Sequence, residues 1–147
     1  MASLEVRALE ARDEPDWRRL WTGYLEFYET AVDEVVYTTT FERLLSAGDN
    51  EFAGLVALRD DEAIGIAHYL FHRHCWRVEN VCYLQDLYVD APVRGTGAGR
   101  ALIEAVYQRA DDAGCPGVYW LTQEFNQAGR RLYDRVATLT PFVKYAR

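Results

Sequence analysis

Apolar and polar residues alternate, or apolar residues run together, in several segments that are typical of β-strands. Leu4–Ala8 alternates at the start of the chain. Two apolar runs, 52–58 and 63–71, flank the polar turn Arg59-Asp60-Asp61-Glu62, which is the pattern of a β-hairpin. Residues 81–89 form a further strand-like run. The pattern therefore predicts one strand at the start and a later meander of three strands.

Other segments carry apolar residues at helical spacing. A first helix follows Asp13-Glu14-Pro15, which supplies capping residues and a proline near the first turn. A short second helix is expected near Thr39, because Thr39 and Glu42 have capping-box spacing. A third helix is expected from about Ala101 to Ala113, with Gly114 as its stop. The first helix has an aromatic-rich apolar stripe, made of Trp17, Leu20, Trp21, Tyr24, Phe27 and Tyr28.

The last third of the chain continues the alternation of strand and helix. Residues 117–122 read as a short buried strand, and the unit from 81 to 122 has the length of a right-handed crossover between parallel strands. Asn126 is placed to cap a final helix that contains Leu132 and Tyr133. Residues 142–145 read as a closing strand. The overall expectation is a single α/β domain over residues 1–147.

A glycine-rich loop lies between the strand at 81–89 and the third helix. Glycines at positions 95, 97 and 99 leave backbone N–H groups uncovered where a helix begins, which is a place that favours an anion. Arg94 and Arg100 flank the loop, although a cation near a helix N-terminus opposes the helix dipole by roughly 0.3–1 kcal/mol. We therefore expect a phosphate-bearing ligand here.

The spacing of the glycines excludes two common phosphate-binding motifs. The dinucleotide motif G-x-G-x-x-G fails, because Arg100 and Leu102 stand where its third glycine would fall. The P-loop motif fails because the chain has no Gly-Lys pair. A nucleotide-binding domain of another kind stays open as an alternative, but it requires a spacing that the loop does not have. The remaining pattern is R-x-x-G-x-G.

Composition sets the broad class. The 147 residues fit one domain, half of them are hydrophobic, and no run of eighteen apolar residues suggests a membrane span. The chain begins directly with strand-like sequence and shows no signal-peptide pattern. Three cysteines without C-x-x-C spacing suggest neither disulfides nor zinc, and His72 and His74 have no third ligand nearby. We expect a cytoplasmic protein without a metal.

Charge argues against one class of partner and permits another. A net charge of −7 and a pI of about 4.9 disfavour nucleic-acid binding, which depends on clustered basic residues. Acidic and aromatic residues after the first helix, including Glu26 and Glu29, are compatible with a polyamine or a lysine side chain. Ordinary solvated surface charge is the alternative explanation.

Three segments together resemble the GCN5-related N-acetyltransferases. Tyr83-Leu84-Gln85-Asp86-Leu87-Tyr88-Val89 is similar to the central strand of that family, and Arg94–Gly99 to its pyrophosphate loop. Asn126 through Leu132-Tyr133 is similar to the family segment after the next strand. The resemblance covers nearly the whole chain and is nearest to the branch that acetylates polyamines, histone tails and other small amines. It implies a mixed sheet of about six to seven strands with about four helices, and it allows a homodimer.

The resemblance also implies a cofactor site for acetyl-CoA. In the family the pantetheine arm bonds to the backbone of the central strand, at positions that match Leu87 and Val89. The pyrophosphate would be bound by the backbone of Gly95, Thr96, Gly97, Ala98, Gly99 and Arg100, with Arg94 adding charge. Asn126 would bond to the cofactor arm, and Tyr133 would lie near the sulfur.

Acetyl transfer to an amine sets requirements that these residues can be tested against. A primary amine has a pKa near ~10.4, so only about one molecule in 10³ is a free nucleophile at pH 7. The tetrahedral oxyanion needs a donor, for which a backbone N–H at a bulge of the central strand is a candidate. The departing thiolate needs a proton, and Tyr133 is the candidate acid, although an aromatic residue on a helix face is commonly a core residue.

Two positions depart from the family pattern. Gln85 stands where the polyamine-acetylating branch commonly has glutamate, and an amide cannot act as a base near neutral pH. Asp86, Glu124 or a water chain is an alternative base, but alternation places Asp86 on the opposite sheet face from Gln85. Val136-Ala137-Thr138 replaces a common glycine and aromatic. The candidate substrate-binding residues are Glu26, Glu29, Gln85 and Glu124.

Two functional hypotheses follow. The first is an N-acetyltransferase in which a primary amine attacks acetyl-CoA directly in a ternary complex. The second is a non-catalytic acyl-CoA sensor or interaction module with the same fold. Gln85 favours the second hypothesis, whereas Asn126 and Tyr133 favour the first.

Overall fold

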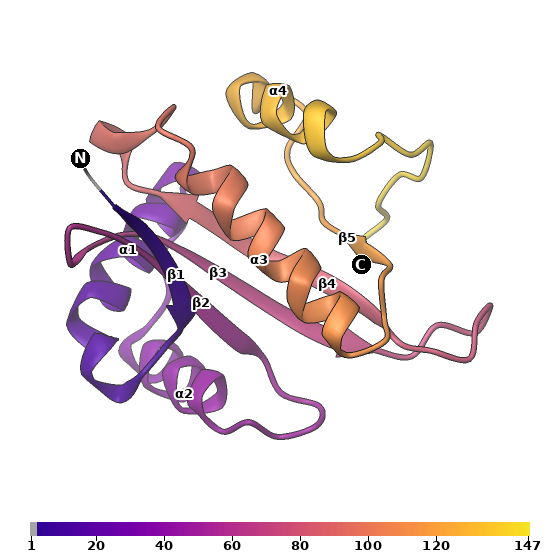
Figure 1. Ribbon diagram of the computed structural model, residues 1–147, viewed down its shortest axis with the longest axis horizontal. Coiled ribbons are helices and arrows are strands. Elements are labelled where there is room, and N and C mark those ends of the chain that lie inside the picture. Colours follow the sequence, from indigo (N-terminus) through magenta and orange to yellow (C-terminus); the bar gives the residue numbers. More distant parts are fainter. Residues whose placement is uncertain (1–2) are drawn as a thin grey trace.

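A computed structural model describes residues 3–147 and shows a five-stranded sheet with four helices (Figure 1). The strands lie in the order β1-β2-β3-β4-β5. β1 to β4 are antiparallel neighbours, and β5 is parallel to β4. Their bounds are β1 Leu4–Ala8, β2 Ala53–Arg59, β3 Glu62–His72, β4 Val81–Val89 and β5 Val118–Tyr119.

The helices cover the two faces of the sheet. Apolar residues alternate along β2 and β3, so Leu55 and Ala67 pack towards one face and Val56 and Ile66 towards the other. One face is covered by α1 and α2, and the other by α3; α4 lies beyond β5 (Figure 1). None of these helices is both long and apolar enough to cross a membrane. Their bounds are α1 Glu14–Phe27, α2 Glu34–Leu45, α3 Ala98–Asp112 and α4 Gln127–Val136.

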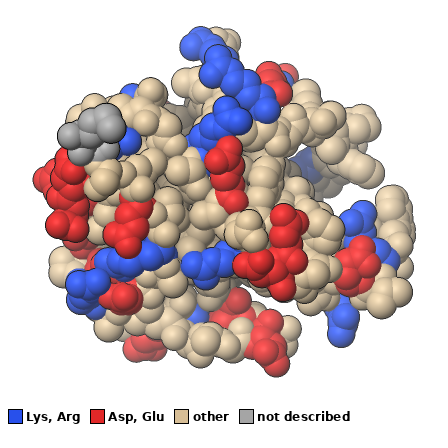
Figure 2. All heavy atoms as spheres, in the orientation of Figure 1, with Lys and Arg blue, Asp and Glu red and all other residues tan. Residues whose placement is uncertain are grey.

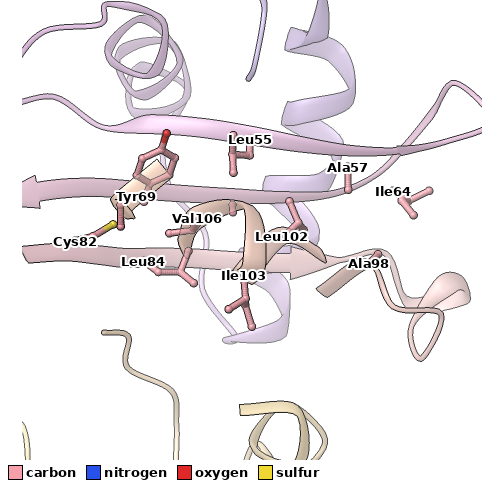
Figure 3. Packing of buried hydrophobic residues seen from close by; sticks show 12 residues of the cluster. Leu55, Ala57, Ile64, Tyr69, Cys82, Leu84, Ala98, Leu102, Ile103 and Val106 are labelled. Carbon is pink, nitrogen blue, oxygen red and sulfur yellow. The ribbon is translucent and has the colours of Figure 1, made fainter. Parts of the chain in front are cut away.

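The α3 face of the core is closely packed. Leu102, Ile103 and Val106 are fully buried and lie against residues of β2, β3 and β4 (Figure 3). These three side chains follow helical spacing, which is why the third helix was predictable from the sequence. They fix the helix whose first turn forms the glycine loop.

Leu102→Ala should lower the free energy of unfolding by about 2–5 kcal/mol, because it leaves a cavity at a fully buried position. Chemical denaturation measures this loss. A surface change on the same helix, Gln108→Ala, serves as the control. A loss below about 1 kcal/mol at Leu102 would contradict the packing described.

Two irregularities shape the meander. Asp60 and Asp61 have positive φ values of 51° and 67°, which close a two-residue turn between β2 and β3. The pairing of β3 with β4 shifts at His68 and Tyr69, which face Asp86 and Leu84. Gln85 is therefore the additional residue of a β-bulge.

The predicted strand count is too high. β5 has two residues, and residues 137–147 form no strand, so the expected closing strand at 142–145 is wrong. Phe142, Val143 and Tyr145 are 76–92% exposed. Their apolar pattern predicts a strand, but a strand also needs a neighbour to supply hydrogen bonds, and this segment has none within residues 3–147.

Two helix starts also differ from expectation. The second helix begins at Glu34 after the extended residue Asp33, so Thr39 lies inside it and is not its cap. Phe41 and Leu44 are buried against α1 and the sheet, and this packing extends the helix beyond its local capping signal. The third helix begins at Ala98, three residues earlier than expected, because Gly97 serves as its N-cap residue.

Candidate active site

The bulge in β4 reverses which sheet face its side chains occupy. Cys82 and Leu84 pack in the α3 core, whereas Asp86 faces α1 and bonds to Trp21. Simple alternation places Leu84 and Asp86 on the same face, so the sequence could not show this reversal. Gln85 is exposed at the reversal point.

β4 and β5 separate directly after a short contact. Their pairing is confined to Cys82 with Val118 and Tyr83 with Tyr119. Beyond it a small hollow opens between β4, α1 and the segment leading to α4. Gln85 of β4 and Tyr133 of α4 both line this hollow. It is lined by Tyr24, Tyr28, Leu84, Gln85, Leu87, Trp120, Leu121 and Tyr133.

Tyr133 is half-buried on α4, with its ring 5.5 Å from that of Trp120 in an edge-to-face arrangement. Burial raises its pKa to about 12, with a smaller contribution from Tyr28. The phenol is therefore protonated at neutral pH and can donate a proton or a hydrogen bond into the hollow.

A second, larger hollow of about 510 Å³ adjoins the first and shares Tyr28 with it. Two of the predicted substrate-binding residues, Glu29 and Glu124, lie here on different segments of the chain. Glu26 lines neither hollow and is exposed on α1. The structure thus brings Gln85, Glu29 and Glu124 to adjoining spaces and leaves Glu26 outside them.

The glycine loop has the backbone conformation expected of an anion cradle. Gly95 and Gly97 have φ values of 81° and 96°, a region that residues with a Cβ rarely adopt. Within residues 3–147 no side chain caps the start of α3, and Ala101 is the residue whose N–H bonds back to Gly97. The backbone N–H groups of Ala98, Gly99 and Arg100 precede that bond and can bind an anion.

The two loop arginines are already engaged by the protein, contrary to the expectation that only a ligand would stabilise them. Arg100 forms an ion pair of 2.8 Å with Glu104, one turn later on α3. Arg94 donates to the Val89 carbonyl and lies over the rings of Tyr88 and Phe27. Acidic and basic side chains are likewise interspersed on the face shown in Figure 2.

Asn126 occupies the N-cap position of α4, as predicted. Its side-chain oxygen accepts a hydrogen bond from the Gly129 N–H at 3.2 Å, and its amide donates to Thr122 at 3.0 Å. These bonds hold the segment between β5 and α4 and thereby position Tyr133. Leu87 and Val89 lie on the part of β4 that follows its pairing with β5, as a cofactor arm between the strands would require.

A buried polar network under the bulge was missed in the sequence. His68 is buried on β3. Trp17 Nε1 donates to His68 Nε2 at 2.9 Å, and His68 Nδ1 lies 2.8 Å from Asp86 Oδ2. Trp21 Nε1 lies 3.3 Å from the same oxygen. The aromatic stripe of the first helix was a signal of burial but not of these bonds.

The network keeps Asp86 ionised. Burial by itself raises the pKa of Asp86, but hydrogen bonds from His68 and Trp21 favour the ionised carboxylate, and the pKa is lowered. Burial and the nearby charge of Asp86 raise the pKa of Tyr24.

Comparison with known proteins decides the family. Residues 14–137 match the model of the acetyltransferase (GNAT) family. The chain belongs to this family. A D-amino-acid N-acetyltransferase of Saccharomyces cerevisiae, HPA3, is 43% identical over 97% of this chain and 89% of its own length. A thialysine N-ε-acetyltransferase of Sus scrofa is 28% identical over 90% of this chain and 82% of its own.

Solved structures confirm the GNAT fold. The aminoglycoside N-acetyltransferase AAC(6')-Iy, in complex with CoA, has a TM-score of 0.86 at 20% identity and covers 100% of this chain and 95% of its own. The ribosomal-protein-alanine N-acetyltransferase of Brucella melitensis has a TM-score of 0.81 at 17% identity, covering 99% and 98%. As a GNAT acetyltransferase, the protein is an enzyme that uses acetyl-CoA to acetylate an amine.

Proposed function

We propose that the enzyme acetylates the primary amine of a small molecule or a lysine-like side chain, by direct attack on acetyl-CoA in a ternary complex. The observation that carries this proposal is the hollow at which the Tyr133 phenol meets the β4 bulge, next to a second hollow that contains Glu29 and Glu124. The first hollow would hold the thioester and the attacking nitrogen. The carboxylates of the second hollow would attract the remaining, positively charged part of the acceptor.

The cofactor would be bound along β4 and at the start of α3. The N–H groups of Gly95 to Arg100 offer donors for the pyrophosphate, and Arg94 and Arg100 add positive charge. The backbone of Leu87 and Val89 offers partners for the pantetheine arm, where β4 is free of β5. Asn126 would assist from the opposite side of the gap.

The reaction requires a hydrogen-bond donor for the oxyanion, a proton donor for the thiolate and an acceptor for the amine proton. As the amine attacks, a backbone N–H at the Gln85 bulge of β4 would stabilise the oxyanion. When the C–S bond breaks, Tyr133 protonates the thiolate. Gln85 can orient the amine but cannot take its proton, so we assign that proton to water or to Glu124, which lines the second hollow.

An amine panel tests the proposal. The purified protein would be mixed with acetyl-CoA and with D-alanine, L-lysine, S-aminoethylcysteine or spermidine, and free thiol would be followed. We expect thiol release that depends on at least one amine, with a matching acetylated product by mass spectrometry. Cofactor binding without thiol release from any amine would overturn the proposal and favour a sensor.

The proposal also includes a cellular location and an oligomeric state. Free Cys75, Cys82 and Cys115 are compatible with a reducing cytoplasm. The exposed apolar residues Phe142, Val143 and Tyr145 support a homodimer. Light scattering coupled to gel filtration would distinguish a dimer from a monomer.

A further inference from the structure

Arg59 connects the end of β2 to the glycine loop. It is the last residue of β2, and its guanidinium Nη2 donates to the Thr96 carbonyl at 3.2 Å. Ala57 packs in the α3 core and Leu58 on the α1 side, so alternation directs the next side chain to the α3 side. Because β2 and β4 are both antiparallel to β3, they are parallel to each other and finish at the same end of the sheet, where the loop begins (Figure 1).

The peptide that Arg59 contacts is one whose backbone can turn over easily. Thr96 lies between Gly95 and Gly97, and glycine adopts positive and negative φ values with similar ease. The backbone itself therefore offers little resistance to rotation of the Thr96–Gly97 peptide. In the structure the Thr96 hydroxyl donates to the Val93 carbonyl, and the Thr96 carbonyl accepts from Arg59. These two bonds hold the peptide in one orientation.

The orientation of this peptide decides what the loop presents to an anion. In a trans peptide the C=O and the following N–H point in opposite directions. With the Thr96 carbonyl directed at Arg59, the Gly97 N–H points away from Arg59, and no backbone carbonyl within residues 3–147 accepts from it. A reversed peptide would present a carbonyl oxygen on that side, where its partial negative charge would repel a phosphate.

The charge of Arg59 is not matched by an acidic side chain. Arg100 is paired with Glu104, whereas Arg59 takes part in none of the ion pairs within residues 3–147. The Nε atom of Arg59 is buried and has no hydrogen-bond partner in this part of the chain. Buried polar groups in folded proteins usually have a partner, so these two features favour an anion close to Arg59.

We propose that Arg59 is a positioning residue of the cofactor site, which holds the Thr96 carbonyl so that the Gly97 N–H faces the pyrophosphate of CoA. Its positive charge adds to the attraction of the same phosphates. This inference deepens the proposed function and rests on the assignment of the glycine loop to the pyrophosphate. It adds to that site a residue that precedes the loop by 37 positions and belongs to no loop motif.

Binding measurements test this role without reference to turnover. The unmodified protein and Arg59→Met would be titrated with CoA by calorimetry. Arg59→Met should weaken CoA binding about 10-fold, the effect expected for the loss of a hydrogen bond from a charged donor. If Arg59→Met does not fold, Arg59→Gln provides the same test, because its shorter side chain also loses the bond to Thr96.

A double-mutant cycle with Gly97→Val shows whether Arg59 acts through the loop peptide. If it does, the effects of the two changes overlap, because the valine already disturbs the peptide that Arg59 holds. Arg59→Met should then weaken CoA binding by no more than about threefold in the Gly97→Val background. A direct and independent contact with a phosphate would instead lower the affinity by the same factor in both backgrounds.

Arg43→Met is the matched control. It removes the same charge from an exposed position on α2, on the opposite face of the sheet from α3. It should bind CoA as the unmodified protein does. Melting temperatures identify any variant that is merely unfolded.

The outcomes separate this inference from the proposed function. The role of Arg59 would be overturned by unchanged CoA affinity in folded Arg59→Met, by an equal loss in Arg43→Met, by independent effects in the cycle, or by no CoA binding to the unmodified protein. CoA binding that depends on Arg59 as predicted, without thiol release from any amine, would overturn the proposed function but support this inference.

Discussion

Replacing Tyr133 with phenylalanine is expected to lower kcat by about 10²-fold, the lower end of the contribution of a general acid. The phenol lies at the hollow beside the β4 bulge, and its pKa of about 12 keeps it protonated throughout the neutral range. Without it, the thiolate must leave unprotonated or take a proton from water. Steady-state kinetics with the best acceptor measures kcat, and calorimetry measures acetyl-CoA affinity, which should stay within about twofold.

Tyr107→Phe provides the control for this change. Tyr107 also packs near Trp120, with ring centroids 6.3 Å apart, but its hydroxyl donates to the Val136 carbonyl and does not line either hollow. Its loss should reduce stability by about 1 kcal/mol and leave kcat nearly unchanged. Equal kcat values for the unmodified protein and Tyr133→Phe would remove Tyr133 from the acid role.

Gly97→Val should weaken acetyl-CoA binding about 10- to 100-fold. A Cβ at this position meets no atom within 4 Å, so the fold has room for it. The change acts instead through the φ value of 96°, which a β-branched residue resists, and through the side chain placed over the first N–H groups of α3. Fluorescence or calorimetric titration with CoA measures the loss.

Gly114→Val separates cofactor binding from backbone strain. Gly114 has a φ of 72°, has no atom within 4 Å of an added Cβ, and lies beyond the other end of α3. Both variants should lose roughly 1–2 kcal/mol of stability from the left-handed conformation. CoA affinity should fall in Gly97→Val alone; a similar fall in both would mean that strain in α3, and not the loop, limits binding.

Local signals in the sequence were sufficient to predict much of the fold around the glycine loop. The apolar spacing of α3, the glycine positions before it and the N-cap residue Asn126 each act over a few neighbouring residues, and the structure has all three. The hydrogen bond from Gly129 to Asn126 spans three residues and needs no tertiary contact. The prediction of a closing strand at 142–145 was wrong because a strand depends on pairing with a neighbouring strand, which a local pattern does not reveal.

The acceptor side of the site depended on contacts between distant segments. Trp17 and His68 are separated by 51 residues, and Trp21 and Asp86 by 65, so no spacing rule connects them. The sequence indicated buried aromatic residues on α1 and showed glutamine at position 85, where the related branch commonly has glutamate. It did not indicate the hydrogen bonds between these segments.

The sequence by itself determined the GNAT family and the glycine-rich loop before α3, because both depend on contiguous motifs whose conformations are set by neighbouring residues. Only the tertiary structure decided where Asp86 points. The bulge at Gln85 adds one residue to β4 and moves the next side chain to the α1 face, where a histidine and two tryptophans complete its surroundings. A period of two along a strand cannot reveal such a reversal, since the shift exists only in the pairing with β3.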